Sequence, residues 1–377
     1  MRQLVGALLF FVLLVVVVLP ALVVRGCDLL LPRGRAPAEP AAEPVVSLYV
    51  NASGRLLELP LEQYVMGVVA AEMPSAFSLE ALKAQAVVAR TYVLKRLRSL
   101  GGAGCDRAEG ADICDDPAHG QAWASWAEMR RRWGFWGFFP AYARVRRAVE
   151  ATRGLVVAYQ GQPVDPLYHS TCAGATEDAA WVWGAPQPWL RSVPCSWDRH
   201  SPFYQTQVTF SAPDLARLLE GQQPQPPSPA SGGSRPAGSA PAAPSGPPAG
   251  SAAPLAAGAP HGGASSPAGA TAPKLEILGR SPTGRVLKVR VDGRELTGTE
   301  VRALLGLRST RFDISQAAGG GVTFTVMGWG HGVGMCQYGA DGMARAGRDF
   351  SEIIRYYYSG AEAVAFSSLG WRATAGK

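Results

Sequence analysis

Two stretches of helical periodicity flank a short turn in the first quarter of the chain. Apolar residues recur three and four positions apart from Leu61 to Val69, and the predicted helix ends before Pro74 because proline disfavours helical conformation in the preceding residue. A second helix is predicted after Ser78, a residue type that often caps helices. Its apolar stripe comprises Leu82, Ala86, Ala89, Val93 and Leu97. The pattern therefore predicts two helices joined by a turn that follows Glu72.

Glu72 lies at the end of the first predicted helix. Val, Ala and Ala precede it, and the macrodipole disfavours negative charge at the C-terminal end of a helix. Both features raise the pKa of a carboxyl group, and a carboxyl that keeps its proton near neutral pH can act as a general acid. Periodicity alone leaves open the alternative of an ordinary surface carboxylate. On the second helix, Lys83 and Arg90 are seven residues apart and so share a face.

The remainder of the chain alternates irregularly between strand and helix patterns. Strands are predicted at residues 45–50, 55–59, 155–159, 163–170, 205–210, 275–280, 285–291 and 322–327. Helices are predicted from Pro140 to a stop at Gly154, at 213–220, from the capping box at Thr297 to Leu305, and from Asp349 to Tyr358. This order favours an α+β fold, in one irregular mixed domain, over a doubly wound sheet.

Composition divides the chain into segments. Residues 1–24 are predicted to be a membrane anchor, and residues 25–43, rich in Pro, Ala and Arg, a tether. Residues 44–221 and 274–372 are predicted to be the two parts of one catalytic domain. The insertion between them, residues 222–273, is almost entirely Pro, Gly, Ala, Ser and Gln. Because such a composition cannot bury a core, the insertion is predicted to be disordered.

Deletion of residues 222–273 should leave the melting temperature and the activity of the protein nearly unchanged. The segment has almost no side chains able to bury apolar area, and shortening a long flexible loop changes its closure entropy only slightly. Thermal unfolding of the deletion variant beside the full chain measures this directly. A large loss of stability would mean that the segment packs against the domain.

The apolar segment near the N-terminus is long enough to span a membrane. Leu4 to Val24 are 21 residues without a charge. At about 1.5 Å per residue, a helix of this length reaches roughly 32 Å, which crosses the apolar core of a bilayer. Arginines flank the segment on both sides, so charge does not fix its orientation. An uncleaved transmembrane helix is predicted.

The chain is basic, with a formal net charge of +7 and a sequence pI near 9.2. This charge suits nucleic acid, an anionic membrane face or the acidic polymers of a cell wall, and does not choose among them. A basic cluster with interleaved aromatic residues, typical of base recognition, is not evident in the sequence. Nucleic acid is therefore the least favoured of the three partners.

Seven aromatic residues gather between positions 123 and 139. They are Trp123, Trp126, Trp133, Phe135, Trp136, Phe138 and Phe139. Such side chains can stack on sugar rings or lie at a membrane surface. Local core packing is the commoner role of clustered aromatic residues, and it is the interpretation favoured here.

Four ordered motifs run through the chain. They are VVAAEMPSAFSLEALKAQAVVARTYVL (68–94), HSTCAGATEDAAWVWG followed by PWLRSVPCSWD (169–198), LTGTEVRALLGLRSTRFDI (296–314) and GWGHGVGMCQYGADGMA (328–344). Together they resemble the stage II sporulation protein D family, which includes amidase-enhancer proteins. The resemblance covers most of the chain outside the N-terminus and the insertion. It implies a lytic transglycosylase that cuts peptidoglycan glycan strands, with the Glu of the AEMP motif, Glu72, as its catalytic acid.

The resemblance also implies which other residues meet the substrate. Lys83 and Arg90 match family positions and are expected to line the groove or to orient Glu72. The segment with His169 and Ser170 is expected to form a wall of the cleft with Glu177 behind it, while His331 and Gln337 of the Gly-rich motif contact sugar. A nucleophilic pair of Cys172 with His169 is disfavoured because residues three apart at a strand end need not face each other.

The six cysteines permit disulfides, metal ligation or free thiols. Cys172 and Cys195 can bridge. In part of the resembled family, the loop that corresponds to Cys105, Cys114 and His119 holds zinc. A further Cys of those relatives is Gly120 here, and a structural zinc normally has four ligands. A Cys105–Cys114 disulfide without metal is therefore the favoured prediction, and the three residues remain zinc candidates.

The resemblance places the protein at the cell membrane of a sporulating bacterium, with its catalytic domain outside the cytoplasm. It implies peptidoglycan glycan strands as substrate during engulfment, and as partners a cell-wall amidase that strips stem peptides and a membrane protein that anchors the complex. The alternative is a non-catalytic wall-binding protein that enhances an N-acetylmuramoyl-L-alanine amidase.

Overall fold

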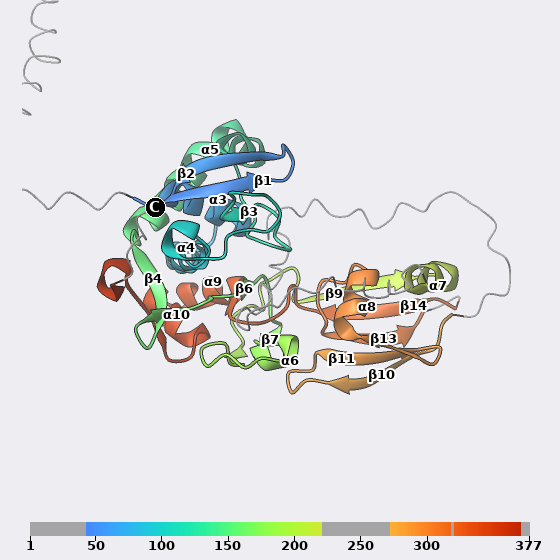
Figure 1. Cartoon of the computed structure of the whole chain (residues 1–377). Helices are drawn as coiled ribbons and strands as arrows, with labels where there is room; N and C mark the ends of the chain where they lie inside the picture. Colours follow the sequence, from blue (N-terminus) through green and yellow to red (C-terminus); the bar gives the residue numbers. More distant parts are fainter. Residues whose placement is uncertain (1–42, 221–271, 318–319, 371–377) are drawn as a thin grey trace, which may run out of the picture. The chain divides into compact units, whose positions relative to one another are not determined.

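The computed structural model describes residues 43–220, 272–317 and 320–370 (Figure 1). The chain divides into two units, Met1–Glu43 and Pro44–Lys377, and the described residues belong almost entirely to the second. The predicted anchor at Leu4–Val24, the tether and nearly all of the insertion lie outside the described residues. Within the described ranges, no helix is both long and apolar enough to cross a bilayer.

The chain first forms a hairpin and then the two predicted helices. β1 (Val45–Val50) pairs antiparallel with β2 (Arg55–Pro60), and β2 leads directly into α3 (Leu61–Glu72). α4 (Leu79–Leu94) follows the turn that contains Pro74, as predicted. Asp341 holds the start of α4, because its Oδ1 accepts a hydrogen bond of 2.7 Å from the Ser78 backbone N–H.

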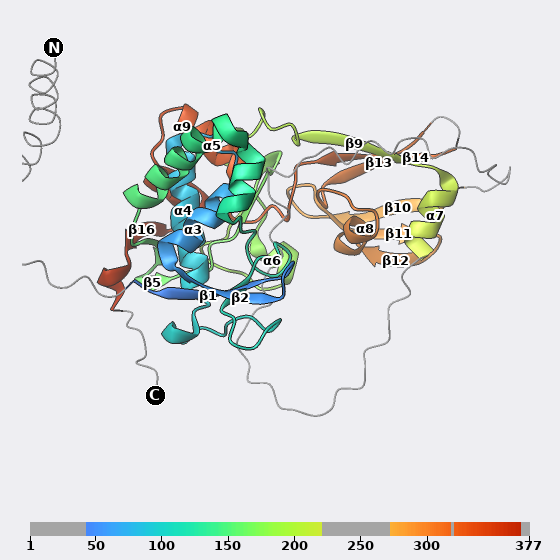
Figure 2. The ribbon, with the colours of Figure 1, turned by 90° about the horizontal axis from the view of Figure 1, so that it is seen from above.

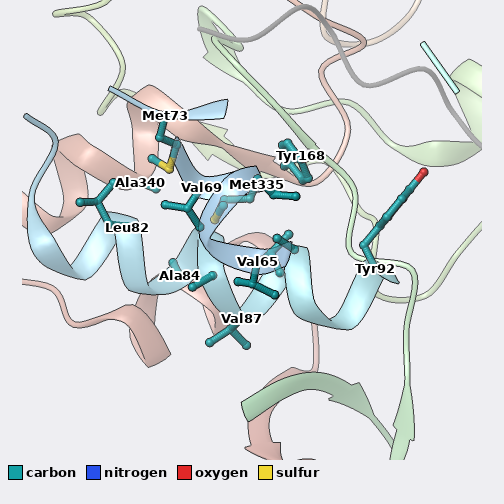
Figure 3. Close-up of a cluster of buried hydrophobic side chains, with 14 of the residues drawn as sticks. Val65, Val69, Met73, Leu82, Ala84, Val87, Tyr92, Tyr168, Met335 and Ala340 are labelled. Atoms are coloured by element: carbon teal, nitrogen blue, oxygen red, sulfur yellow. The ribbon is translucent and has the colours of Figure 1, made fainter. Parts of the chain in front are cut away.

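α4 is the centre of the larger hydrophobic core. Its predicted stripe is fully buried, but so is nearly every other side chain from Ala84 to Leu94, because α4 packs against α3, α5, α9, α10 and β4. Figure 3 shows Val65 of α3 and Met73, the residue after α3, in this core together with Leu82 and Val87 of α4. Of the two residues predicted to share a face, Arg90 is buried by this packing, whereas Lys83 near the start of α4 stays partly exposed.

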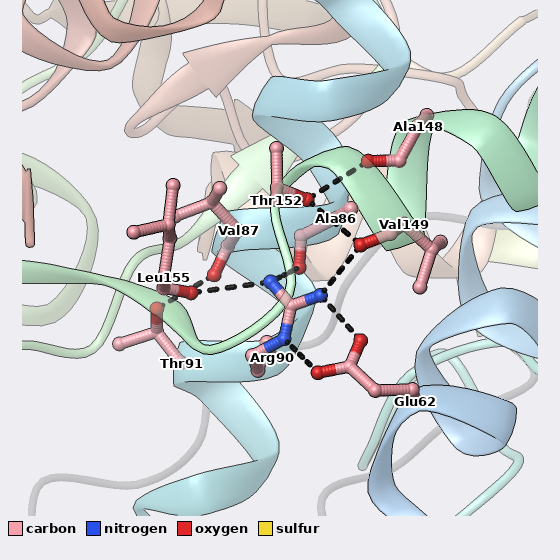
Figure 4. Close-up of polar contacts among 9 residues, drawn as sticks. All are labelled: Glu62, Ala86, Val87, Arg90, Thr91, Ala148, Val149, Thr152 and Leu155. Atoms are coloured by element: carbon pink, nitrogen blue, oxygen red, sulfur yellow. Dashed lines mark hydrogen bonds and ion pairs between the residues drawn. The ribbon is translucent and has the colours of Figure 1, made fainter. Parts of the chain in front are cut away.

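Arg90 is the largest fully buried side chain of α4. Its Nη2 and Nε bond the two carboxylate oxygens of Glu62 at 2.5 and 2.8 Å, and its Nη1 donates to the Leu155 carbonyl at 3.1 Å (Figure 4). This fork-to-fork pair joins α3 to α4 and to the start of β4. Because its guanidinium is enclosed in the core, Arg90 does not line a groove, and its predicted alternative role, orienting Glu72, stays a prediction.

α5 (Trp126–Ala151) begins earlier than predicted and packs beside α3 and α4 (Figure 2). A capping box of Ser125 and Glu128 starts it, and Pro140, predicted as the first residue, lies inside it. The helix is kinked at Gly134, whose φ of 67° is one that glycine adopts without strain. The capping box was not recognised in the sequence because the aromatic residues around it obscure the helical periodicity.

Most of the aromatic run on α5 does not enter the core. Phe138 is buried, whereas Trp126, Phe135, Trp136 and Phe139 are exposed, Trp136 by 87%. Ring contacts link Phe138 edge-on to Trp126 and Phe139. The prediction of local core packing is therefore wrong for these four side chains, which present an apolar surface to solvent.

Short strands fill the space between the helices. β4 (Leu155–Tyr159) pairs with β5 (Gln162–Pro163) and with β16 (Ala361–Ala365), and β3 (Ile113–Cys114) adds to β1 in parallel. β6 (Tyr168–His169) pairs in parallel with β15 (Met335–Cys336), and β7 (Gly174–Ala175) with β8 (Pro194–Cys195). The remaining short elements are η2 (Arg98–Leu100), α6 (Ala179–Trp183), α9 (Gln337–Arg345), α10 (Phe350–Tyr357) and η3 (Phe366–Leu369).

A second hydrophobic core lies among the strands that follow. β9 (Gln205–Phe210), β14 (Val322–Met327) and β13 (Phe312–Gln316) form one sheet, and β10 (Leu275–Arg280), β11 (Val286–Val291) and β12 (Arg294–Thr297) another. α7 (Ala212–Glu220) and α8 (Gly298–Leu304) complete it. The fold is thus mixed, with helices and several small sheets, in agreement with the predicted irregular α and β order. The division into two cores was not predicted.

Candidate functional site

Glu72 ends α3 and is buried, with 2% of its surface exposed. Burial raises the pKa of its carboxyl group to about 7, because removal from water disfavours the charged form. Hydrogen bonds to the carboxylate oppose this effect without cancelling it. Glu72 is therefore not the surface carboxylate of the alternative interpretation. Near neutral pH its protonated and ionised forms are both populated.

Three groups from distant segments bond the Glu72 carboxylate. The Ala122 backbone N–H donates to Oε1 at 3.0 Å, and the side chains of Tyr168 and Gln337 also hydrogen-bond to it. Gln121 orients Tyr168, because its Nε2 donates to the Tyr168 hydroxyl at 3.1 Å. These donors hold the carboxylate in one orientation and lower the free energy of its ionised form.

Arg132 of α5 places a positive charge at the C-terminal end of α3, the end that carries Glu72. Its Nη1 donates to the carbonyls of Ala70 and Ala71 at 2.6 and 3.1 Å, and its positive charge lowers the pKa of Glu72. The predicted macrodipole effect is therefore met by a cation at the same helix end. Desolvation is the main cause of the raised pKa.

The raised pKa of Glu72 predicts a pH dependence of stability. The folded state binds this proton more tightly than the unfolded state, whose pKa is near 4.5, so stability should fall as the pH rises from about 4.5 to about 7 and stay level above it. The contribution is about 3 kcal/mol, since one pKa unit corresponds to about 1.4 kcal/mol. Urea unfolding at several pH values, with Glu72→Gln as comparison, measures it. An unchanged pH profile in the variant would contradict the assignment.

His169 and His331 form a second polar group on the other side of β6. Successive strand residues point to opposite faces, so Tyr168 reaches Glu72 while His169 faces away from it. The rings of His169 and His331 lie 5.8 Å apart, and burial lowers the pKa of both, that of His331 to about 3. Both imidazoles are neutral. His331 also hydrogen-bonds the backbone of Tyr168, which supports the strand that carries this Glu72 contact.

Glu177 lies in the same group and is almost fully buried. Its Oε2 accepts hydrogen bonds from the hydroxyls of Ser281 and Thr283. Arg285, also buried, is stabilised in its charged form by Glu177. These contacts connect the segment after β7 to the β10–β11 turn, so Glu177 joins the two parts of the domain.

The remaining predicted site residues are dispersed. Gln337 is beside Glu72 and also donates to Gln85 of α4 at 3.3 Å. Lys83 pairs with Glu80 at 2.6 Å on the partly exposed side of α4. Ser170 is buried, and its hydroxyl contacts Thr171. Of the seven predicted substrate residues, the structure therefore brings Gln337 into contact with Glu72; contact of these residues with sugar stays a prediction.

The loop before Ala122 brings Cys105, Cys114 and His119 together. Both thiols are free, so the predicted Cys105–Cys114 disulfide is wrong. His119 Nδ1 lies 3.3 Å from Cys114 Sγ and 3.7 Å from Cys105 Sγ, and its Nε2 contacts Asp106 at 2.9 Å. A carboxylate on the far nitrogen is the usual partner of a metal-bound imidazole. Two thiols and an imidazole in this arrangement fit a zinc ion whose fourth ligand comes from outside the set.

Sequence reasoning missed most of the groups that hold Glu72. The Ala122 N–H has no signature, since any residue but proline supplies it. Arg132 was not predicted, because it lies within the aromatic run and no sequence pattern relates it to Glu72. Tyr168 could have been found from its position beside the predicted His169. Successive residues of a strand point to opposite faces, so the neighbour of one site residue can serve a site on the other face.

Comparisons with known proteins agree with this architecture. The family model described as stage II sporulation protein matches residues 51–159, and one for a domain of unknown function matches residues 262–334. The stage II sporulation protein D of Bacillus subtilis (strain 168) is 32% identical over 329 residues, which is 86% of this chain and 81% of that protein. The chain belongs to the stage II sporulation protein D family.

Two other relatives delimit what family membership covers. The stage II sporulation protein D of Bacillus amyloliquefaciens is 31% identical over 88% of this chain and 81% of its own length. The amidase enhancer of Bacillus subtilis (strain 168) is 26% identical over 80% of this chain but only 40% of its own length. The resemblance drawn from the four motifs is thus confirmed, and a role in sporulation follows from it.

Proposed function

We propose that this family member is a lytic transglycosylase that cleaves the bond between N-acetylmuramic acid and N-acetylglucosamine in peptidoglycan glycan strands. The observation that carries the proposal is the buried Glu72, whose pKa of about 7 makes it both a proton donor and, once ionised, a proton acceptor near neutral pH. Its position in the AEMP motif supports the same role.

The surroundings of Glu72 favour a reaction that needs one carboxyl group. Its hydrogen-bond partners are a backbone N–H, a phenol and a carboxamide, and the Arg132 guanidinium is the charged group with the largest effect on its pKa. Hydrolysis of a glycoside usually requires a second carboxylate to activate water or to form a covalent intermediate. A transglycosylase replaces water with the 6-hydroxyl of the muramic acid, so the same carboxyl can serve twice.

The steps follow from this arrangement. Glu72 donates its proton to the glycosidic oxygen, the bond to C1 breaks, and the N-acetylglucosamine leaves with that proton. The Glu72 carboxylate, stabilised by Ala122, Tyr168 and Gln337, then accepts the proton of the 6-hydroxyl as its oxygen bonds C1. The product is a 1,6-anhydro ring, no water is consumed, and Glu72 regains its proton.

The cysteine loop supports the site indirectly. Zinc held by Cys105, Cys114 and His119 would act as a structural ion that fixes the loop. Gln121 and Ala122 follow His119 closely, and both belong to the Glu72 network. These residues would thus place the Ala122 N–H and the Tyr168 hydroxyl, while the proton transfers belong to Glu72.

The proposed setting is the membrane of a sporulating cell during engulfment, with the catalytic domain outside the cytoplasm and the chain anchored by its N-terminal apolar segment. Peptide-stripped strands are the proposed substrate. A cell-wall amidase that removes the stem peptides and a membrane protein that holds the complex are the proposed partners. The basic net charge of +7 suits an acidic wall polymer.

Incubation of the full chain with peptide-free glycan strands tests the proposal. Strands should shorten and acquire 1,6-anhydro-muramic acid ends, measured by mass spectrometry. The burial of Glu72 makes this a demanding test, because a glycosidic oxygen must come within hydrogen-bonding distance of a carboxyl that is 2% exposed. Strands that remain intact would count against the enzyme.

A second candidate function rests on the relative named amidase enhancer. In that case the domain binds the wall and stimulates an N-acetylmuramoyl-L-alanine amidase without cutting strands itself. Adding an amidase to the same samples and scoring released peptides separates the two. Stimulation by both the wild-type chain and Glu72→Gln, with intact glycan strands throughout, would favour the enhancer.

A further inference from the structure

Three cysteines and an aspartate meet in the interior of the larger core. Cys172 follows β6, Cys195 ends β8, Asp198 comes three residues later, and Cys336 ends β15. None of the four is exposed. They come from three chain segments, at residues 172, 195–198 and 336, in the region of β6, β7 and α9 (Figure 1). Sequence reasoning considered a Cys172–Cys195 bridge, but all three thiols are free.

The ligand atoms of this group are spaced for one metal ion. The three sulfurs and a carboxylate oxygen of Asp198 all lie within 4.8 Å of one another. Asp198 Oδ2 is 3.2 Å from Cys172 Sγ and 3.6 Å from Cys336 Sγ. A tetrahedral zinc ion with Zn–S bonds of about 2.3 Å places its ligand atoms roughly 3.5 to 4 Å apart. The four groups therefore match the number, type and spacing of ligands in a closed zinc site.

The carboxylate of Asp198 gives independent support. Its Oδ2 accepts the backbone N–H groups of Cys172 and Ala173 at 2.9 and 2.7 Å, which orients the group, while Oδ1 is buried without a hydrogen-bond partner. A buried carboxylate oxygen without a partner costs free energy. A cation bound through both oxygens of this carboxylate would remove this cost, whereas a disulfide between two of the cysteines leaves it unchanged.

Two of the three sulfurs, those of Cys336 and Cys195, also have hydrogen-bond partners of the kind that stabilise thiolate ligands. The Gly339 N–H at the start of α9 donates to Cys336 Sγ at 3.3 Å. The Tyr357 hydroxyl lies 3.2 Å from Cys195 Sγ. Gly339 has no room for a side chain, because a Cβ there would lie 2.1 Å from the Tyr357 hydroxyl and 2.7 Å from Cys195 Sγ. Such outer contacts orient the ligands of a metal.

We propose that Cys172, Cys195, Asp198 and Cys336 bind one structural zinc ion, distinct from the Cys105–Cys114–His119 group. A closed set of four ligands leaves no position for substrate, so the ion stabilises the fold. It ties β6, β8 and β15 together. Tyr168 of β6 and Gln337, next to Cys336, are the two side chains that hydrogen-bond Glu72, so the ion holds the segments that carry them. The inference rests on the cluster's geometry and does not depend on the proposed activity.

Metal content of single variants tests this site. The full chain is expressed with zinc, purified under reducing conditions and analysed by elemental mass spectrometry. Cys336→Ala should remove one equivalent of zinc. The matched control, Cys114→Ala in the loop, should leave that equivalent in place. With cobalt(II) in place of zinc, the Cys114→Ala protein should show the absorption bands of tetrahedral cobalt and thiolate charge-transfer absorption. The variant that combines Cys114→Ala with Cys336→Ala should show neither.

A wild-type readout covers the case in which Cys336→Ala fails to fold. Zinc should protect the peptides with Cys172, Cys195 and Cys336 from alkylation, and chelation should expose them and lower the melting temperature. Zinc content unaffected by Cys336→Ala would overturn the proposal. So would a peptide map of the wild-type protein, isolated without reductant, that joins two of these cysteines by a disulfide, or wild-type protein that takes up no metal at this cluster after reduction and reconstitution.

Discussion

Glu72→Gln should abolish most glycan cleavage while the protein stays folded. The substitution keeps the size of the side chain and part of its hydrogen bonding, but it removes the transferable proton. The expected loss of rate is about 10²-fold or more, the usual scale for a general acid. At pH 8 the variant should be at least as stable as the wild type, because it no longer buries an ionised carboxylate. Cleavage rates and urea unfolding of the same samples measure both effects.

Glu150→Gln is the matched control for this experiment. Glu150 is an exposed glutamate of α5 that pairs with Arg146 on the helix surface. Its substitution should leave cleavage unchanged and stability within about 0.5 kcal/mol. Undiminished cleavage by Glu72→Gln would remove Glu72 as the acid, and Glu177, another buried carboxylate, would become the next candidate.

Glu62→Gln should be strongly destabilising, although Glu62 is remote from the proposed chemistry. The Arg90 side chain is 0% exposed and that of Glu62 14% exposed, so the substitution leaves a buried guanidinium without its counter-charge. Breaking a buried pair costs about 3–5 kcal/mol, and the partial exposure of Glu62 favours the lower end of this range, about 3 kcal/mol. Chemical denaturation measures it.

A double-mutant cycle separates the ion pair from ordinary packing. Glu62→Gln combined with Arg90→Met should be less destabilised than the sum of the two single changes, because the second substitution removes the charge that the first leaves unpaired. Glu58→Gln on the exposed face of β2 is the control and should change little. Strictly additive effects would mean that the pair contributes no coupling.

The local elements near Glu72 were predictable because their signals are short in range. Periodicity located α3 and α4, Pro74 separated them, and capping boxes marked the starts of α8 and α10. The AEMP motif selected Glu72 among all carboxylates of the chain. Each of these features depends on a few neighbouring residues, so contacts with distant parts of the chain change the prediction little.

The features that failed depend on contacts between distant segments. The spacing of Lys83 and Arg90 puts them on one face, but only the packing of α3, α5 and β4 shows that Arg90 is buried against Glu62 while Lys83 stays partly exposed. The cysteines were paired by closeness in sequence. In the fold, Cys114 meets His119, and Cys172 meets Cys336 as well as Cys195. The two hydrophobic cores were not predicted either, because no local sequence pattern marks the point at which the chain passes from one core to the other.

The reaction in water labelled with ¹⁸O tests the central claim most directly. Peptide-free glycan strands are incubated with the full chain, and the new ends are analysed by mass spectrometry. Intramolecular attack by the 6-hydroxyl predicts ends with a 1,6-anhydro ring and no ¹⁸O, since Glu72 acts alone and water takes no part. Reducing ends that carry ¹⁸O would contradict this mechanism, because they would show that water, and not the 6-hydroxyl, attacks C1.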